Sequence, residues 1–206
     1  CRTIFLSLPG GKEVEQICLG EGGLLSKVKP GATVVDLSTA PVALARRLFA
    51  AFEANGVAFA DAPVARTRQA AIDGTLSIMV GATAETFARI EPLLRHMASE
   101  VTHCGDAGAG QAVKILNNMI LFQTVVALGE ALSIARAHGV DGKVLYETLT
   151  KGSADSFALR NHGMKAMLPA IFPERAFSTE YALKDLGYAI EMAEEKGVPA
   201  LGADVA

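Results

Sequence analysis

The chain has 206 residues, half of them apolar, and a formal net charge of −3. That length is enough for a buried core and two small domains, and the charge offers no bulk electrostatic case for binding nucleic acid or an anionic membrane. The three cysteines, Cys1, Cys18 and Cys104, have no CxxC spacing. They are typical of free thiols in a reducing cytoplasm, and neither they nor the four histidines predict a metal site.

The first half of the sequence alternates short apolar runs with amphipathic segments. Strands are expected at 2–9, 32–37, 57–61, 75–80 and 101–103, and helices at 14–19, 41–55 and 83–97. This alternation is the pattern of a doubly wound α/β domain.

After Gly110 the pattern changes to helices only, expected at 112–137, 142–151, 156–167 and 177–197. The change, together with the glycines of Asp106–Gly110, predicts a boundary between an α/β domain at 1–107 and an all-α domain at 108–206. The helix expected at 112–137 is nearly all apolar. It carries several polar residues, among them Lys114 and Asn118, so we expect no membrane span.

Lys114 and Asn118 lie four residues apart, and therefore on one face of this helix. A helix that is apolar on most sides is expected to be buried. A buried lysine is costly unless it is paired or used, and burial lowers a lysine's pKa, which favours proton transfer. The alternative is that Lys114 extends to solvent from the first helical turn.

Five motifs follow one another in register along the chain. They are Asp36-Leu-Ser-Thr-Ala-Pro41, Asp61-Ala-Pro-Val64, Gly74-Thr-Leu-Ser-Ile-Met-Val-Gly81, Gly108-Ala-Gly-Gln-Ala-Val-Lys114 with Asn118, and Lys184-Asp185-Leu186. The series resembles the β-hydroxyacid dehydrogenase family, relatives of 3-hydroxyisobutyrate and 6-phosphogluconate dehydrogenases. The resemblance covers essentially the whole chain. It implies a Rossmann-type NAD(P)-binding domain followed by an all-helical domain often used for dimerisation.

The glycine-rich nucleotide-binding turn of such a domain is not found in this sequence. No Gly-x-Gly-x-x-Gly precedes the first expected strand, and Gly20-Glu-Gly-Gly23 follows a helix instead of a strand. By resemblance this turn would precede Cys1. We therefore expect a Rossmann-type domain truncated at its N-terminus, in an internal segment of a longer protein.

The resemblance also implies the residues that contact the cofactor, NAD or NADP. Thr39 follows an expected strand, where ligands of open α/β sheets bind, and is expected to contact the cofactor; its alternative role is to cap the next helix. Leu8 and Pro9 match the strand end that lies beside the adenosine half of the cofactor. The alternative is that they simply end the strand. Lys184 matches a lysine that reaches the cofactor. Its alternative is an exposed pair with Asp185.

Lys114 is the implied catalytic acid/base, and Asn118 is implied to hold the substrate. Phe177 and Asp185 match positions that line the site. The family's usual Ser-Gly-Gly after Asp61-Ala-Pro-Val64 is replaced by Ala65-Arg66-Thr67. Arginine binds anions with two parallel hydrogen bonds, and the segment is similar to the Gly-Arg-Thr of sulfolactaldehyde reductases. Arg66 and Thr67 are therefore expected to bind the substrate, whereas Arg68 is expected to be solvated.

Together with these patterns, the resemblance implies a cytoplasmic NAD(P)-dependent oxidoreductase that acts on a small 3-hydroxy acid or its semialdehyde. Its expected partners are a small anionic substrate and further copies of itself, as a homodimer or homotetramer formed through the helical domain, without nucleic acid or membrane. Two alternatives stay open. One is a reductase of a sulfonated or doubly anionic aldehyde, and the other a catalytically silent binding or dimerisation relative.

Overall fold

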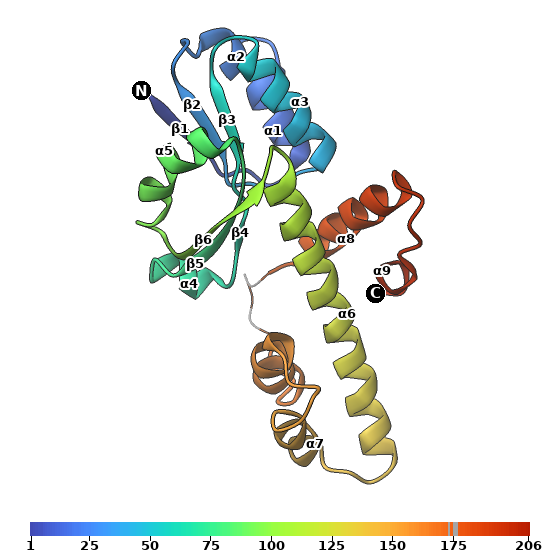
Figure 1. Ribbon diagram of the computed structural model, residues 1–206. Coiled ribbons are helices and arrows are strands. Elements are labelled where there is room, and N and C mark those ends of the chain that lie inside the picture. Colours follow the sequence, from blue (N-terminus) through green and yellow to red (C-terminus); the bar gives the residue numbers. More distant parts are fainter. Residues whose placement is uncertain (173, 175–176) are drawn as a thin grey trace. The chain divides into compact units, whose positions relative to one another are not determined.

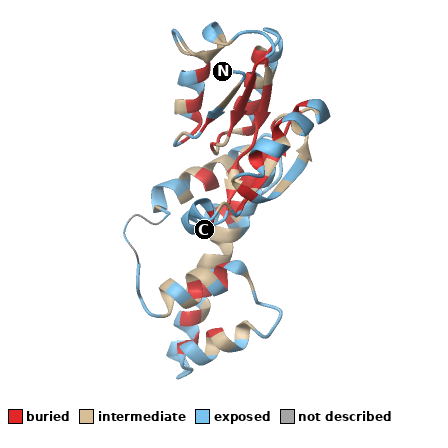
Figure 2. Cartoon of the chain, turned by 90° about the vertical axis from the view of Figure 1, so that its left-hand side faces the viewer, coloured by how far each residue is buried: buried red, intermediate tan, exposed pale blue. Residues whose placement is uncertain are grey.

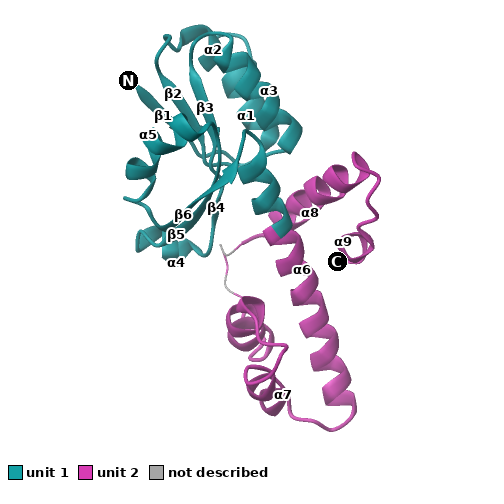
Figure 3. Cartoon of the chain, in the orientation of Figure 1, with its two compact units in different colours: residues 1–116 teal, residues 117–206 magenta. Residues whose placement is uncertain are grey.

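The computed structural model describes residues 1–172, 174 and 177–206 (Figure 1). The chain forms two compact units, unit 1 at Cys1–Leu116 and unit 2 at Asn117–Ala206 (Figure 3). The division falls inside the long helix α6, Ala109–Ala137.

Unit 1 is built on a six-stranded sheet with the order β1-β2-β3-β5-β4, in which β6 also pairs with β5. Strands β1, β2 and β3 are parallel to one another, as are β5 and β6. The two sets meet in an antiparallel contact between Asp61 and Gly81, which β4 extends along β5. The strands are β1 (Thr3–Leu6), β2 (Thr33–Asp36), β3 (Ala58–Asp61), β4 (Val64–Ala65), β5 (Leu76–Gly81) and β6 (Ala98–Gly105).

Helices pack on both faces of this sheet because alternate residues of a strand point to opposite sides. Val34 belongs to a core with residues of α1 and α3, while its neighbour Val35 belongs to a second core with residues of α5. Figure 2 shows the buried strands in red. The helices are α1 (Gly11–Leu19), α2 (Leu24–Lys27), α3 (Val42–Glu53), α4 (Arg68–Ile72) and α5 (Ala84–Leu94). This arrangement confirms the predicted α/β class.

Unit 2 contains only helices and loops among its described residues. Its elements after α6 are α7 (Gly142–Leu149), the π-type helix η1 (Leu159–Met167), α8 (Thr179–Glu194) and α9 (Leu201–Val205). The core joins α6, α7 and η1 through Leu128, Leu132, Tyr146 and Leu159. The hydroxyl of the fully buried Tyr146 donates to the Leu128 carbonyl at 2.9 Å. The predicted all-helical second domain is thus confirmed.

Helix α6 differs from its prediction in two respects. It begins at Ala109 instead of Ala112, and it is not buried all round. Val113, Leu116 and Ile120 are exposed, so burial is confined to one side of the helix. Among the helices in the described part of the chain, only α6 is long and apolar enough to span a membrane. Core helices of water-soluble proteins meet the same criteria of length and composition.

Candidate functional site

The carboxyl ends of β1, β2 and β3 lie at one edge of the sheet, where open α/β sheets bind ligands. The loop after β2 is fixed there by Ser38, which is almost fully buried. Its hydroxyl accepts a hydrogen bond from the Leu8 N–H at 2.9 Å, and its own N–H donates to Asp36 Oδ1 at 3.0 Å. These bonds join the loops after β1 and β2 and leave the half-buried Thr39 between two buried neighbours.

Asp61, the last residue of β3, anchors the beginning of α6. Its Oδ1 accepts from the Gly108 N–H at 2.6 Å, and its Oδ2 from the Gln111 N–H at 2.8 Å. A carboxylate at this end of a helix satisfies backbone donors and faces the positive end of the helix dipole. The approach is close: a Cβ on Gly81 would lie 2.5 Å from Asp61 Oδ1.

The side chain of Gln111 continues this network. It is fully buried, and its amide binds the loop after β2 at two points. Oε1 accepts from the Ala40 N–H at 3.0 Å, and Nε2 donates to the Ser38 carbonyl at 2.7 Å. The first turn of α6 is therefore fixed to both the β2 loop and the end of β3.

Two buried carboxyl groups, Asp36 and Asp61, lie side by side in the register of β2 and β3. Burial raises the pKa of Asp36 to about 6, although its hydrogen bonds with Ser38 act in the opposite direction. Burial likewise raises the pKa of Asp61 to about 6, against the lowering effect of the Gly108 and Gln111 N–H groups. Burial and the nearby Asp36 also raise the pKa of the Cys18 thiol to about 12, so Cys18 stays a neutral core residue.

These shifts predict an unusual pH dependence of stability. The Asp36 carboxyl ionises near pH 4 when unfolded but near 6 when folded, so its contribution to stability is full below pH 4 and is lost as the pH rises through 6. We expect Asp36→Asn to remove this loss. The free energy of unfolding of this variant, measured in urea and taken relative to that of wild type, should rise by up to about 3 kcal/mol between pH 4 and pH 7. A difference that does not change with pH would contradict the assignment.

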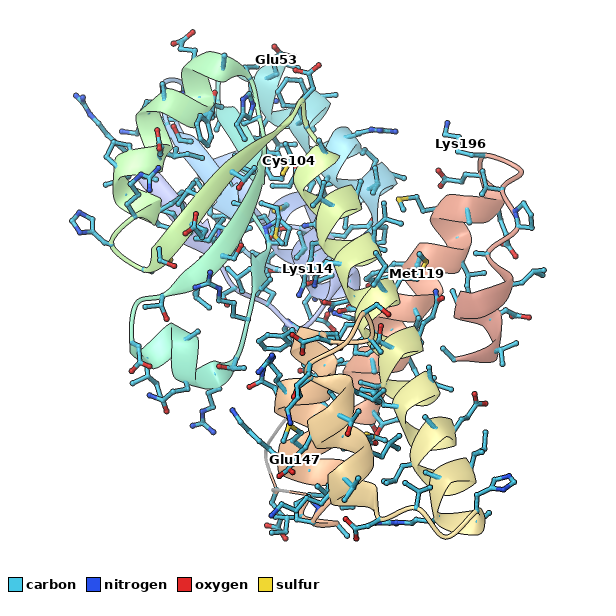
Figure 4. All side chains as sticks on the ribbon, turned by 60° about the horizontal axis from the view of Figure 1, so that its bottom comes forward. Glu53, Cys104, Lys114, Met119, Glu147 and Lys196 are labelled. Carbon is cyan, nitrogen blue, oxygen red and sulfur yellow. The ribbon has the colours of Figure 1, made fainter. Side chains whose placement is uncertain are left out.

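Lys114 lies on α6 (Figure 4), in the part of this helix that belongs to unit 1. It follows Gln111 by three residues, so the two side chains leave the same side of the helix. Its relative exposure is 8%, which means that the lysine is buried and does not extend to solvent. The structure thus places the predicted acid/base one turn beyond the anchored start of α6.

In unit 2, Asn118 and Asp185 form a buried polar pair between α6 and α8. Asn118 Nδ2 donates to Asp185 Oδ2 at 2.6 Å, and Asn118 Oδ1 accepts from Asn117 Nδ2 at 3.0 Å. Lys184 Nζ lies 3.3 Å from Asp185 Oδ1, near the rings of Tyr181 and Tyr188. The Lys184–Asp185 pair is therefore largely buried and is not the exposed pair of the alternative interpretation.

Phe177, the remaining predicted site residue of unit 2, begins the segment before α8 and is 58% exposed. Its ring lies 5.8 Å from that of Phe122 on α6 and 6.1 Å from that of Tyr181 on α8. These contacts hold an exposed aromatic ring beside the helix that carries Lys184 and Asp185.

Arg66 and Thr67 bind atoms of their own unit. Arg66 Nη1 donates to the Thr75 carbonyl at 2.7 Å and to Ser99 Oγ at 2.9 Å. The Arg66 backbone has φ +86°, a left-handed conformation that glycine adopts easily and arginine does not. The Thr67 hydroxyl caps α4 by accepting from the Ala70 N–H at 3.2 Å. The loop thus keeps a glycine-type backbone, and the guanidinium fastens it to the beginnings of β5 and β6.

Two residues of this network, Asp61 and Gln111, were not predicted as site residues from the sequence. The Asp61 carboxylate accepts a hydrogen bond from the N–H of a residue 47 positions later, whereas capping patterns in a sequence involve only neighbouring residues. A signal for Gln111 was present, because a long-chain amide stands beside glycines at the first turn of an apolar helix. Its partners in the β2 loop could not be read from the sequence.

Comparison with known proteins assigns the whole chain to one family. The family model for the NAD binding domain of 6-phosphogluconate dehydrogenase matches residues 1–105. The model for the NAD-binding domain of NADP-dependent 3-hydroxyisobutyrate dehydrogenase matches residues 108–206. Both models describe binding of a nicotinamide dinucleotide, which is the cofactor class of this fold.

Individual relatives agree with the family models. The chain is 36% identical to 2-(hydroxymethyl)glutarate dehydrogenase of Eubacterium barkeri, covering 95% of this chain and 65% of that protein. It is 37% identical to 3-hydroxyisobutyrate dehydrogenase of Pseudomonas aeruginosa, covering 93% and 66%. The chain thus spans slightly less than two thirds of the length of these relatives.

A solved structure extends the similarity to the fold. Mycobacterium tuberculosis 3-hydroxyisobutyrate dehydrogenase with L-serine matches with a TM-score of 0.86 and 30% identity, covering 98% of this chain and 70% of that one. The two family models match consecutive parts of the chain, and an α/β unit is followed by a helical unit. The chain therefore belongs to the β-hydroxyacid dehydrogenase family.

Proposed function

We propose that the whole protein that carries this sequence is an NAD(P)-dependent oxidoreductase, which interconverts a small 3-hydroxy acid and its semialdehyde. The observation that carries the proposal is the buried Lys114, held on a helix whose start is fixed to the ligand-binding edge of the sheet. The relatives are named as dehydrogenases of 2-(hydroxymethyl)glutarate and 3-hydroxyisobutyrate, which supports this substrate class.

A nicotinamide cofactor, when bound, would supply hydride transfer to and from the carbinol carbon of the substrate. Lys114 Nζ takes the hydroxyl proton in oxidation and gives it back to the carbonyl oxygen in reduction. The Asn118 amide orients the hydroxyl or carboxylate, and Asp185 and Phe177 complete the substrate-binding set. The burial of Lys114 keeps water from competing for the proton.

The residues present fit a dinucleotide cofactor. Thr39, Leu8 and Pro9 lie in the two loops beyond the carboxyl ends of β1 and β2, and the hydrogen bond from the Leu8 N–H to the Ser38 hydroxyl joins these loops. Lys184 offers a cation for the cofactor. Either NAD or NADP is compatible with these residues.

A screen of the whole protein against small 3-hydroxy acids and aldehydes, with NAD and NADP in turn, tests the proposal. We expect turnover of at least one 3-hydroxy acid, seen as formation of the reduced nicotinamide. Binding of NAD(P)H without turnover of any substrate in the panel would favour the alternative, a catalytically silent binding or dimerisation relative.

A second candidate, reduction of a sulfonated or doubly anionic aldehyde, is favoured by the replacement of a glycine-type residue by Arg66. A guanidinium has five N–H donors, and the hydrogen bonds of Arg66 to Thr75 and Ser99 both involve Nη1. In this proposal Arg66 and Thr67 bind the distal anionic group of the substrate.

Arg66→Gly removes the guanidinium without adding backbone strain, because glycine accepts the φ of +86°. We expect it to lower kcat/KM for a doubly anionic aldehyde by about 10- to 100-fold, as loss of a charge-assisted hydrogen bond implies, and to affect an uncharged aldehyde less. Arg68→Ala, the exposed neighbour, should be nearly silent. An equal loss for all substrates in steady-state kinetics would show that Arg66 serves only the loop.

We further propose a cytoplasmic homodimer or homotetramer formed through the helical unit, without nucleic acid or membrane. Large apolar side chains are exposed on α6 and α9 of unit 2, among them Ile120, Ile134, Leu201 and Val205. Exposed apolar surface of this kind favours association. Light scattering of the whole protein in solution would give its mass directly, and a monomeric mass would reject this assembly.

A further inference from the structure

We propose that Gln111 is a positioning residue, which sets the place of the Thr39 loop relative to the first turns of α6. The inference rests on the proposed function, since it assumes that Thr39 contacts the cofactor and Lys114 the substrate. The inference goes beyond that function, because it assigns Gln111 a role in which it contacts neither the cofactor nor the substrate and acts through the loop.

The first argument is which atoms the Gln111 amide binds. Its two partners are the Ser38 carbonyl and the Ala40 N–H, the backbone groups on either side of Thr39. Ser38 and Ala40 are 4% and 1% exposed, whereas Thr39 between them is only half-buried. The two bonds thus hold the backbone of Thr39 from both flanks, while Thr39 itself is less buried than either neighbour.

The second argument is that Gln111 is itself held at its backbone. Its N–H donates to Asp61 Oδ2 at 2.8 Å, so the residue cannot shift along the helix axis without breaking the anchor of α6. Lys114 follows on the same helix, three residues further. One fully buried residue therefore links the β2 loop, the end of β3 and the helix that carries the acid/base.

The third argument is that the two loop partners require a side chain that both donates and accepts a hydrogen bond. One partner is an acceptor and the other a donor, so the side chain must donate at Nε2 and accept at Oε1. A methionine of similar length does neither and leaves both backbone groups without this partner. A glutamate matches the pair only when it is protonated, because the ionised carboxylate cannot donate to the Ser38 carbonyl.

A double-mutant cycle in the whole protein tests the inference, with NAD(P)H fluorescence as the readout of affinity. We expect Gln111→Met to weaken binding of the reduced cofactor about tenfold in the wild-type background, but less than twofold in the Thr39→Ala background. Additive effects, or an unchanged affinity in Gln111→Met, would overturn the inference. Failure of the proposed function would appear separately, as bound NAD(P)H without turnover of any substrate.

Two further variants distinguish positioning from general loss of stability. Thr86→Val removes the partly buried hydrogen bond that the Thr83 hydroxyl donates to Oγ1 of the buried Thr86, on α5 of unit 1, and should leave cofactor affinity unchanged. The affinity of Gln111→Glu, taken as a ratio to wild type at each pH, should recover as the pH falls and the carboxyl gains its proton. A ratio that is constant with pH, or a Thr86→Val defect equal to that of Gln111→Met, would reject the positioning role.

Discussion

Replacing Lys114 by alanine should lower kcat of the whole protein by about 10²–10⁴-fold, the usual contribution of a positioned general acid or base. The reason is that Lys114 is buried on the helix fixed by Asp61 and Gln111, where it would carry the proton that leaves the hydroxyl group. Cofactor affinity should change little because Ser38 and Gln111 hold the loops that are proposed to contact the cofactor. Steady-state kinetics over a range of pH measures both quantities.

The matched control is Lys143→Ala, which removes an exposed lysine from α7 whose partner, Glu147, is 3.7 Å away. An exposed ion pair of this kind contributes little, so activity should stay near that of wild type. If Lys114→Ala also turned over at a near-wild-type rate, the assignment of Lys114 as the acid/base would be wrong.

The second large effect concerns the close contact between α6 and the sheet. A Cβ on Gly110 would lie 2.8 Å from the Gly81 nitrogen and 2.9 Å from the Asp61 carbonyl, and closer still to the Met79 carbonyl. All three are backbone atoms of the sheet and cannot rotate away. We expect Gly110→Ala to destabilise the protein by at least about 2–3 kcal/mol in urea unfolding, at the upper end of the cost of overpacking.

Gly187→Ala on α8 is the opposite case. This glycine also lies in a helix, but a Cβ there would meet no atom within 4 Å. The substitution should stabilise the protein by roughly 0.5–1 kcal/mol, the usual preference of a helix interior for alanine over glycine. If Gly110→Ala were as well tolerated as Gly187→Ala, the close packing of α6 on β3 and β5 would be incorrect.

The fold was predictable because it depends on local patterns. The apolar runs that contain Val34 and Val35 indicated strands covered on both faces, and the two cores confirm it. The change to helices after Gly110 indicated the second unit, and these elements form there. Helix ends were less accurate, since α6 begins three residues before its predicted start.

The interactions that build the site could not be predicted because they join residues that are distant in the sequence. The Asp61 carboxylate meets Gly108 and Gln111 only after β3 and α6 have packed together. The contacts of Arg66 with Thr75 and Ser99 likewise need β5 and β6 in place. From the sequence, Arg66 could be assigned to an anion or to solvent, but not to a backbone carbonyl.

The most direct test of the central claim follows the hydrogen atom itself. The whole protein is given NAD(P) and an accepted 3-hydroxy acid that carries deuterium on its carbinol carbon, and the reduced cofactor is analysed by mass spectrometry. We predict that one deuterium reaches the nicotinamide for each molecule oxidised, and that the Lys114→Ala variant shows this transfer at a rate lower by about 10²–10⁴-fold. Reduced cofactor without deuterium, or equal rates of transfer in the two proteins, would contradict the account.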